Sequence, residues 1–297
     1  MMKIDRMTTA GPGRLPFPER LPTSEGRHLV AIDLDGTTLH HDGSLSQDVI
    51  DAVAEAQEAG HDIVVATGRS LIATVPVATA LGLVDNYLVC SNGAVTAALD
   101  ADEPGGARLL DVRTFDPGPA LSVLRDAWPD AQMAVEEVGR GFKVSGDFEG
   151  TDDLEGRIRV VDWAELVSTP TTRVTFRSAT GTSEDFLELV ERIGLHGVNY
   201  AVGFTAWLDI APEGVSKASG LERIARELGS DPMRTVAVGD QRNDLEMLQW
   251  AACGVAMGNA PPEVQAVADL VTAHVDEDGL AVVLRALPPG QVEERCA

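Results

Sequence analysis

The chain has 297 residues, and its 47 acidic and 23 basic side chains give a formal net charge of -24 at pH 7. So large a negative charge argues against nucleic acid as a partner, because phosphates would be repelled, and it disfavours anionic membrane surfaces as well. The hydrophobic fraction of 44% is ordinary for a soluble globular protein, no apolar run approaches the ~18 residues of a membrane span, and the length suits about two domains.

The start of the chain and its cysteines bear on location. Residues 1–26 lack the apolar core of a signal peptide, and their four prolines without periodicity predict a flexible extension. The three cysteines are scattered and form no CxxC pair, which is typical of a reducing compartment. We therefore expect a cytoplasmic protein.

The first predicted strand, over 28–34, runs into two acidic residues and a glycine. Side chains alternate along an extended backbone, so the carboxylates of Asp33 and Asp35 point the same way. Gly36 suits a sharp turn or the close approach of a ligand. A simple hairpin turn at Asp35-Gly36 is the plainer alternative.

Strands and helices then alternate. A helix opens at Ser46 and stops at Gly60. A buried strand over 63–66 leads into Thr67, a helical pattern covers 70–81, and a third strand over 87–90 ends at Ser91. This order predicts a parallel sheet with right-handed crossovers.

The pattern changes over 94–212, where short strands and turns dominate. One clear helix is predicted over 184–193, and the alternation over 198–210 indicates an antiparallel pair. From residue 213 the strand–helix alternation resumes. We therefore predict an α/β fold: a Rossmann-like parallel sheet with helices on both faces, formed by 27–93 and 213–290, plus an inserted α+β cap domain over 94–212.

Four polar loops occupy one position in this pattern. Each follows a predicted strand or opens a helix at the carboxyl edge of the sheet, where ligands of open α/β folds bind. Only three of the 23 basic residues are lysines, so Lys217 at a helix start, where the dipole disfavours a cation, invites a functional reason. The loops are Asp33-Leu34-Asp35-Gly36-Thr37, Thr67-Gly68-Arg69, Ser216-Lys217 and Gly239-Asp240-Gln241-Arg242-Asn243-Asp244.

These loops, in this order and with an insert of this size between the second and third, resemble the haloacid dehalogenase superfamily of phosphatases. The likeness is to its Cof-type branch (class IIB), which carries a large α+β cap, and it covers about residues 28–287. Gln241-Arg242 and Thr38 depart from the residues common in that branch. The resemblance implies a Mg²⁺-dependent phosphatase that hydrolyses small phosphomonoesters, such as sugar phosphates or phosphorylated cofactors, through an aspartyl-phosphate intermediate.

The same resemblance assigns roles to single residues. Asp33 would be the nucleophile and Asp35 the general acid and base. Hard oxygen ligands beside a phosphate suit Mg²⁺. The metal ligands would be Asp33, Asp35 through its carbonyl, Asp240, and Asp244 or alternatively Asn243. The phosphate ligands would be Gly36, Thr67, Gly68 and Lys217, and the substrate or outer contacts Arg69, Asn92 and Asn243.

Plainer interpretations stay open. Asp240 and Asp244 could be helix caps, Thr67-Gly68 a turn, and Lys217 a surface lysine. A phosphomutase of the phosphomannomutase type would use the same nucleophile, and a ligand-binding module without catalysis ranks last. In the cap, Arg140, Lys143, Arg173 and Arg177 are candidate contacts for a leaving group, with solvated strand charges as the simpler interpretation. We expect a small phosphorylated metabolite as the partner, no nucleic acid or membrane, and a monomer or homodimer.

Overall fold

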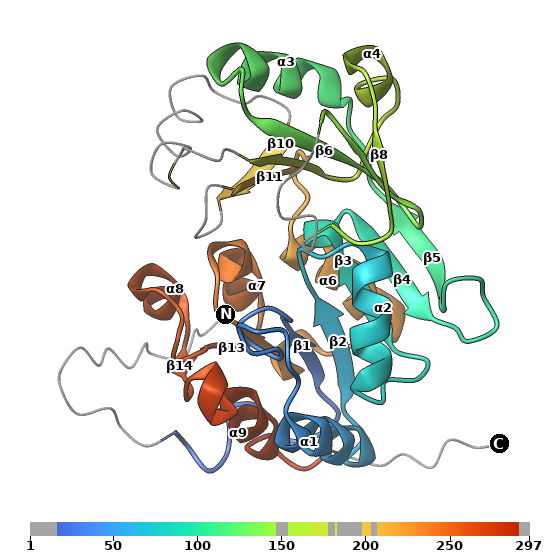
Figure 1. The fold of residues 1–297 in the computed structure, drawn as a ribbon. Coiled ribbons are helices and arrows are strands. Elements are labelled where there is room, and N and C mark those ends of the chain that lie inside the picture. Colours follow the sequence, from blue (N-terminus) through green and yellow to red (C-terminus); the bar gives the residue numbers. More distant parts are fainter. Residues whose placement is uncertain (1–16, 147–153, 178–181, 183–197, 203–206, 291–297) are drawn as a thin grey trace. The chain divides into compact units, whose positions relative to one another are not determined.

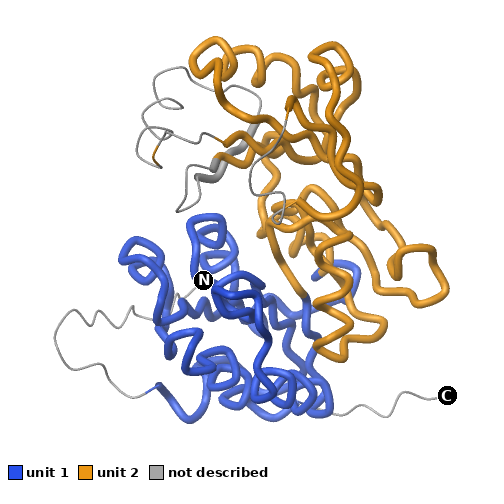
Figure 2. Tube along the Cα trace, in the orientation of Figure 1, with its two compact units in different colours: residues 1–64, 225–297 blue, residues 65–224 orange. Residues whose placement is uncertain are grey.

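The computed structural model describes residues 17–146, 154–177, 182, 198–202 and 207–290. The chain divides into two compact units, unit 1 of residues 1–64 with 225–297 and unit 2 of residues 65–224 (Figure 2). The helix expected over 184–193 lies outside the described residues. Among the helices that are described, none is long and apolar enough to cross a membrane.

Unit 1 is built on a parallel sheet of apolar strands, most of them fully buried (Figure 1). Strand β1 (Leu29–Ile32) pairs with β12 (Thr235–Gly239), which pairs with β13 (Cys253–Ala256), and β14 (Leu270–Val271) follows. Parallel strands buried on both faces read as continuous apolar runs, which is why the sequence reveals them. The helices of this unit are α1 (Gln47–Glu58), α7 (Leu245–Trp250), α8 (Pro262–Val267) and α9 (Gly279–Arg285).

Strand β2 (Asp62–Ala66) crosses the division between the units, and the strand order of the eight-stranded sheet is β14-β13-β12-β1-β2-β3-β4-β5. In unit 2, β3 (Tyr87–Cys90) is parallel to β2, whereas β4 (Val95–Leu99) and β5 (Ala107–Val112) continue the sheet antiparallel. Helix α2 (Leu71–Ala80) lies in front of these strands and α6 (Lys217–Leu228) behind them (Figure 1). The α/β fold with helices on both faces is therefore confirmed; the domain boundaries at 94 and 212 stay a prediction.

A second sheet in unit 2 has the order β10-β11-β9-β6-β7-β8. The antiparallel pair expected over 198–210 is confirmed by β10 and β11. Helix α3 (Pro117–Ala127) was not predicted, because the prolines of its first turn resemble a loop; proline is in fact well suited to that position, and Asp116 caps the helix. The remaining elements are β6 (Gln132–Glu137), β7 (Gly141–Val144), β8 (Arg157–Val160), α4 (Trp163–Leu166), β9 (Val174–Arg177), β10 (Val198–Val202) and β11 (Trp207–Pro212).

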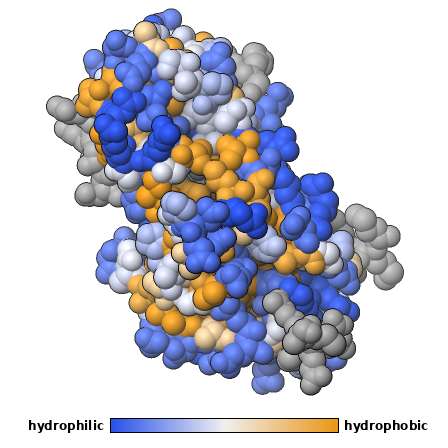
Figure 3. Space-filling view, turned by 90° about the vertical axis from the view of Figure 1, so that its right-hand side faces the viewer, coloured by the Kyte–Doolittle hydropathy of each residue, from blue (hydrophilic) through white to orange (hydrophobic). Residues whose placement is uncertain are grey.

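Strand β5 is the edge of the eight-stranded sheet and keeps part of its apolar surface exposed. Leu109 is 47% and Val112 38% exposed, and Figure 3, which faces the side carrying β5 in Figure 1, shows hydrophobic residues gathered on the surface. Asp111 lies between them and pairs with Arg113 at 2.7 Å and Arg223 at 3.3 Å. Charges on an edge strand oppose unwanted strand pairing.

Candidate active site

Two of the predicted acidic residues follow neighbouring parallel strands in unit 1. The register pairs Ile32 of β1 with Val238 of β12, and the Asp33 amide donates to the Val238 carbonyl at 3.0 Å. Asp33 therefore leaves β1 at the edge where Asp240 leaves β12. Asp33 is 3% exposed and Asp240 2%, so both carboxylates are buried at the carboxyl end of the sheet.

Asp244 reaches the same edge from the short 3-10 turn η4 (Arg242–Asp244). Its Oδ2 accepts from the main-chain N–H groups of Asp240 and Gln241, each at 2.9 Å. A Cβ on Gly239 would lie 2.5 Å from the carboxyl carbon of Asp244, so only glycine leaves room for this side chain. Asp244 stands at the N-cap position of α7, but its side chain makes no cap bond to that helix. Its Oδ2 accepts instead from the Gln241 amide as the third residue of a capping box on η4, and Asn243 lies beside it in the turn.

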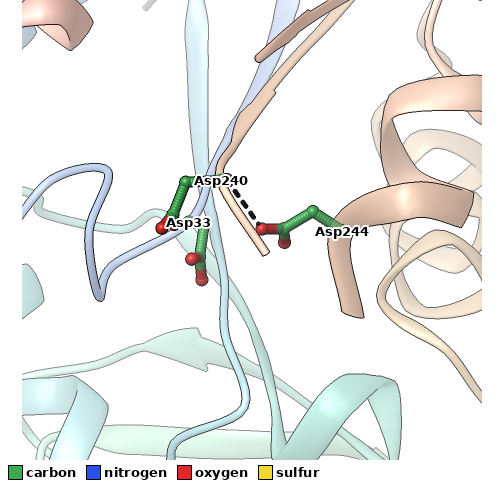
Figure 4. A group of neighbouring side chains, drawn as sticks. All are labelled: Asp33, Asp240 and Asp244. Atoms are coloured by element: carbon green, nitrogen blue, oxygen red, sulfur yellow. Dashed lines mark hydrogen bonds between the residues drawn. The ribbon is translucent and has the colours of Figure 1, made fainter. Parts of the chain in front are cut away.

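Asp33, Asp240 and Asp244 form a group in which one carboxylate oxygen from each lies within 4.8 Å of the others (Figure 4). Each pair of buried negative charges at such a separation repels by about 3 kcal/mol in a protein-like medium. A divalent cation removes that cost, and an all-oxygen set suits Mg²⁺. The donor chemistry of this group therefore fits a hard metal ion.

The turn after β1 holds the Asp240 carboxylate in place. Thr37 Oγ1 donates to Oδ1 of Asp240 at 3.1 Å, and Asn259 Nδ2 donates to its Oδ2 at 3.2 Å. The same Asn259 amide donates to the Gly36 carbonyl at 2.8 Å. The hydroxyl of Thr38, which departs from the residue common in the Cof-type branch, donates to the Asp33 carbonyl at 2.5 Å.

Asn259 was not predicted as a residue of this site. The signal was present, because Asn259 comes shortly after β13, at the same edge as Asp33 and Asp240. Asp35 is half-buried and is not a member of the carboxylate group; its predicted metal contact is the main-chain carbonyl. Arg242, which also departs from the residues common in the Cof-type branch, forms a 2.7 Å ion pair with Glu263.

In unit 2, the loop after β2 and the turn after β3 are joined by main-chain hydrogen bonds. The Ser91 amide donates to the Arg69 carbonyl at 2.8 Å, and the Asn92 amide donates to the Thr67 carbonyl at 3.1 Å. Thr67 is fully buried, and its Oγ1 accepts from the Arg69 amide at 3.1 Å. With one lone pair engaged in this way, the Thr67 hydroxyl keeps its hydrogen for another acceptor.

Lys217 belongs to the same corner of unit 2. It is the first residue of α6 and only 1% exposed, so it is not the surface lysine of the plainer interpretation. A Cβ on Gly93 would lie 2.0 Å from the Ser216 carbonyl oxygen, which shows how closely the turn after β3 approaches the start of α6. Arg223 Nη2 also donates to the Gly93 carbonyl, at 2.6 Å.

The four basic candidates from the cap have different surroundings. Lys143 is 3% exposed and donates to the Glu165 carbonyl at 3.1 Å and to Thr169 Oγ1 at 3.0 Å. Arg173 is 5% exposed, so neither is the solvated strand charge that the simpler interpretation expected. Arg177 is half-buried. Arg140 is exposed and lines a hollow of about 350 Å³ together with Glu137, Arg157 and Arg159.

Comparisons with known proteins agree with this geometry. A family model described as haloacid dehalogenase-like hydrolase matches residues 30–115 and 159–284. The pyridoxal phosphate phosphatase YbhA of Escherichia coli (strain K12) is 30% identical over 275 residues, which cover 85% of this chain and 96% of that protein. The 5-amino-6-(5-phospho-D-ribitylamino)uracil phosphatase YitU of Bacillus subtilis (strain 168) is 26% identical over 263 residues, covering 87% and 96%. A solved structure of the HAD subclass IIB sugar phosphatase BT4131 matches with a TM-score of 0.72 at 24% identity, covering 86% of this chain and 96% of that one.

Proposed function

The chain belongs to the haloacid dehalogenase-like hydrolases, and from that premise we propose that it is a Mg²⁺-dependent phosphatase of small phosphomonoesters. The observation that carries the proposal is the group of three buried carboxylates at the ends of β1 and β12. Capping alone does not require three acids within 4.8 Å of one another. A site that binds a metal ion and a phosphate does require such a group of acids, because the cation offsets the negative charge of the carboxylates and that of the phosphate.

The residues that would hold the ion are Asp33, Asp240 and Asp244, with the Asp35 carbonyl. When bound, Mg²⁺ supplies charge compensation for the carboxylates and for the phosphoryl group. The hydrogen bonds from Thr37 and Asn259 fix the Asp240 carboxylate, so this side chain enters the reaction already oriented.

The chemistry we propose is a double displacement on phosphorus. A carboxylate oxygen of Asp33 forms a bond to phosphorus while the bond to the leaving alcohol breaks, and Asp35 donates a proton to the departing oxygen. Asp35 then accepts a proton from water as that water attacks the phosphorus of the acyl phosphate. The bond to the Asp33 oxygen breaks, which releases inorganic phosphate and restores both carboxyl groups.

Phosphate binding is proposed for Gly36, Thr67, Gly68 and Lys217. The Thr67 hydroxyl has a hydrogen to donate because its oxygen already accepts from the Arg69 amide. Lys217 would contribute a local positive charge for an anionic substrate, which a chain of net charge -24 as a whole repels. Asn92 and Arg69 are proposed as outer contacts, and Arg69 lies 3.9 Å from Glu155 in an ion pair.

The substrate class that we propose is a small phosphorylated metabolite, either a sugar phosphate or a phosphorylated cofactor. Two relatives are named for a cofactor phosphate and for a phosphorylated ribitylaminouracil, and the solved relative is named a sugar phosphatase. All three names describe a compact phosphomonoester, which is the chemistry that the carboxylate group would accept.

The test is hydrolysis of p-nitrophenyl phosphate with MgCl₂ or EDTA, using the parent chain and two variants. Asp33→Asn removes the nucleophile and is expected to lower kcat by at least about 10³-fold. Asp51→Asn removes an exposed charge on α1 and is the matched control with parent activity. Turnover that persists in EDTA, or full activity in Asp33→Asn, contradicts the proposal. A panel of phosphorylated metabolites then ranks the substrates by released inorganic phosphate, and isomerised esters without release would indicate a mutase.

A further inference from the structure

Arg173 and Glu136 form a buried ion pair that holds the loop after β2. Arg173 precedes β9 and Glu136 lies on β6, so both come from the six-stranded sheet. They are 5% and 4% exposed, and Arg173 Nε lies 3.9 Å from Oε2 of Glu136. Breaking such a pair is costly, yet apolar replacements often stabilise a protein as well as the pair does. Stability alone is therefore a weak reason for its presence.

The guanidinium of Arg173 is directed at one peptide group of the loop. Its Nη1 donates a short hydrogen bond to the Gly68 carbonyl, 105 residues away in the sequence. The amide of that same peptide belongs to Arg69 and donates to Thr67 Oγ1 at 3.1 Å. A continuous chain of hydrogen bonds thus runs from the cation through the Gly68–Arg69 peptide to the Thr67 hydroxyl, and each bond in such a chain polarises the next.

Glu136 holds the neighbouring turn. Its Oε2 accepts from Ser91 Oγ at 2.7 Å and from Thr172 Oγ1 at 2.9 Å. Ser91 and Asn92 have φ values of 49° and 53°, a left-handed backbone that is unfavourable for a non-glycine residue. Surrounding contacts must compensate for that strain, and the bond from Ser91 to Glu136 is one of them.

We propose that Arg173 and Glu136 are positioning residues for phosphate binding, which set the Gly68–Arg69 peptide and thereby the direction and donor strength of the Thr67 hydroxyl. This inference rests on the proposed function, since it is the proposed phosphatase activity that would bring a phosphate to the loop after β2. It also gives Arg173 a role different from the leaving-group contact considered from the sequence. The guanidinium acts through Thr67 and does not touch the substrate.

The first experiment is a double-mutant cycle on p-nitrophenyl phosphate hydrolysis. Arg173→Lys keeps a positive charge and a donor but loses the planar fork, and Thr67→Val removes the hydroxyl at nearly constant volume. Arg173→Lys is expected to lower kcat/KM about tenfold in the parent chain and less than about twofold in the Thr67→Val background, because coupled residues are not additive. Equal effects in both backgrounds overturn the proposal.

The second experiment separates positioning from substrate contact and from general damage. Arg173→Lys and Glu136→Gln are expected to weaken inhibition by inorganic phosphate and to lower kcat/KM by the same factor for p-nitrophenyl phosphate and for a sugar phosphate. The MgCl₂ concentration for half-maximal activity is expected to stay at the parent value, because neither Arg173 nor Glu136 belongs to the group of three carboxylates. A loss that depends on the leaving group, or unchanged phosphate inhibition, overturns the inference.

The control is Arg157→Met, which removes an exposed arginine from β8 of the same sheet and is expected to keep parent kinetics. If the parent chain itself shows no Mg²⁺-dependent hydrolysis, the proposed function fails first, and the inference falls with it. If the parent is active and Arg173→Lys matches it, only the inference fails. Glu136→Gln removes the charge but keeps one oxygen that can accept from both Ser91 and Thr172, so it serves where an Arg173 variant does not fold.

Discussion

Replacing Gly36 by alanine tests whether the turn after β1 exists to let the Asp240 carboxylate approach. Gly36 has a φ of +79°, and a Cβ added there would lie 2.4 Å from Oδ2 of Asp240. Gly43 has the same φ of +79°, but a Cβ there would meet nothing within 4 Å. Gly36→Ala and Gly43→Ala therefore share the backbone cost and differ in the contact with the carboxylate.

The magnitude follows from the bonds that hold Asp240. In both variants the left-handed backbone conformation lowers the free energy of unfolding by about 1–2 kcal/mol, because it is unfavourable for alanine. In both variants the lower conformational entropy of the unfolded chain raises it by about 0.4–1 kcal/mol. Only in Gly36→Ala must Asp240 move, away from donors on Thr37 and Asn259 at 3.1 and 3.2 Å. A hydrogen bond to a charged group contributes about 1.5–3 kcal/mol. Losing one of these two hydrogen bonds should lower the free energy of unfolding of Gly36→Ala by about 1.5–3 kcal/mol relative to that of Gly43→Ala.

The assay is urea unfolding of both variants and the parent chain, with and without MgCl₂. A ligand that binds only the native state raises the free energy of unfolding. Gly43→Ala is expected to keep the parent's response to MgCl₂, whereas Gly36→Ala loses most of it because Asp240 is displaced. Equal unfolding free energies for the two variants would refute the reasoning, as would an unchanged MgCl₂ response in Gly36→Ala.

The remaining predictions concern buried groups away from the site. Burial, and next the neighbouring His28, lower the pKa of His61 from its ordinary 6.5 to about 4, and its Nδ1 accepts from the His28 amide at 3.1 Å. Because the unfolded chain takes up this proton first, the contribution of His61 to the free energy of unfolding should be constant above pH 6.5 and fall by about 3 kcal/mol as the pH drops towards 4. His61→Gln should therefore reduce the slope of stability against pH between these values in urea titrations at stepped pH. Burial raises the pKa of Cys90 and of Cys253 to about 12, so in a chain whose third cysteine is replaced by serine both thiols should resist Ellman's reagent at pH 8 until urea unfolds the protein. Rapid labelling of the native chain would show that these side chains are accessible.

Much of the fold was predictable from local patterns. Strands β1, β2, β3, β12 and β13 are short apolar runs, and the first four are followed directly by a polar residue. Burial on both faces produces such runs directly. Helix α3 was missed because the same prolines that open it also occur in loops, and only the packing of its apolar side against the six-stranded sheet decides between the two. Strands β4 and β5 extend the core sheet antiparallel through long-range pairing that no local pattern specifies.

Some residues of the candidate site were predictable from local patterns, and others were not. The acids at 33, 240 and 244 were found from the sequence because each lies at or near the end of a strand, and strand ends are fixed by the same local pattern as the strands. Lys217 was found because lysine is rare in this chain. Asn259 was missed, although the same rule about strand ends applies to it. The catalytic and binding roles of these residues stay a prediction until activity is measured.

The sequence by itself determined the family, the alternation of strands and helices, and which residue types lie at the carboxyl edge of the sheet, because these depend on neighbours within a few positions. Only the tertiary structure decided which atoms meet. The two bonds from Asn259 to Gly36 and Asp240, and the bond from Arg173 to the Gly68 carbonyl, join residues that lie far apart along the chain or on separate elements. Contacts of that kind depend on how whole strands and helices pack, and packing is a property of the complete fold.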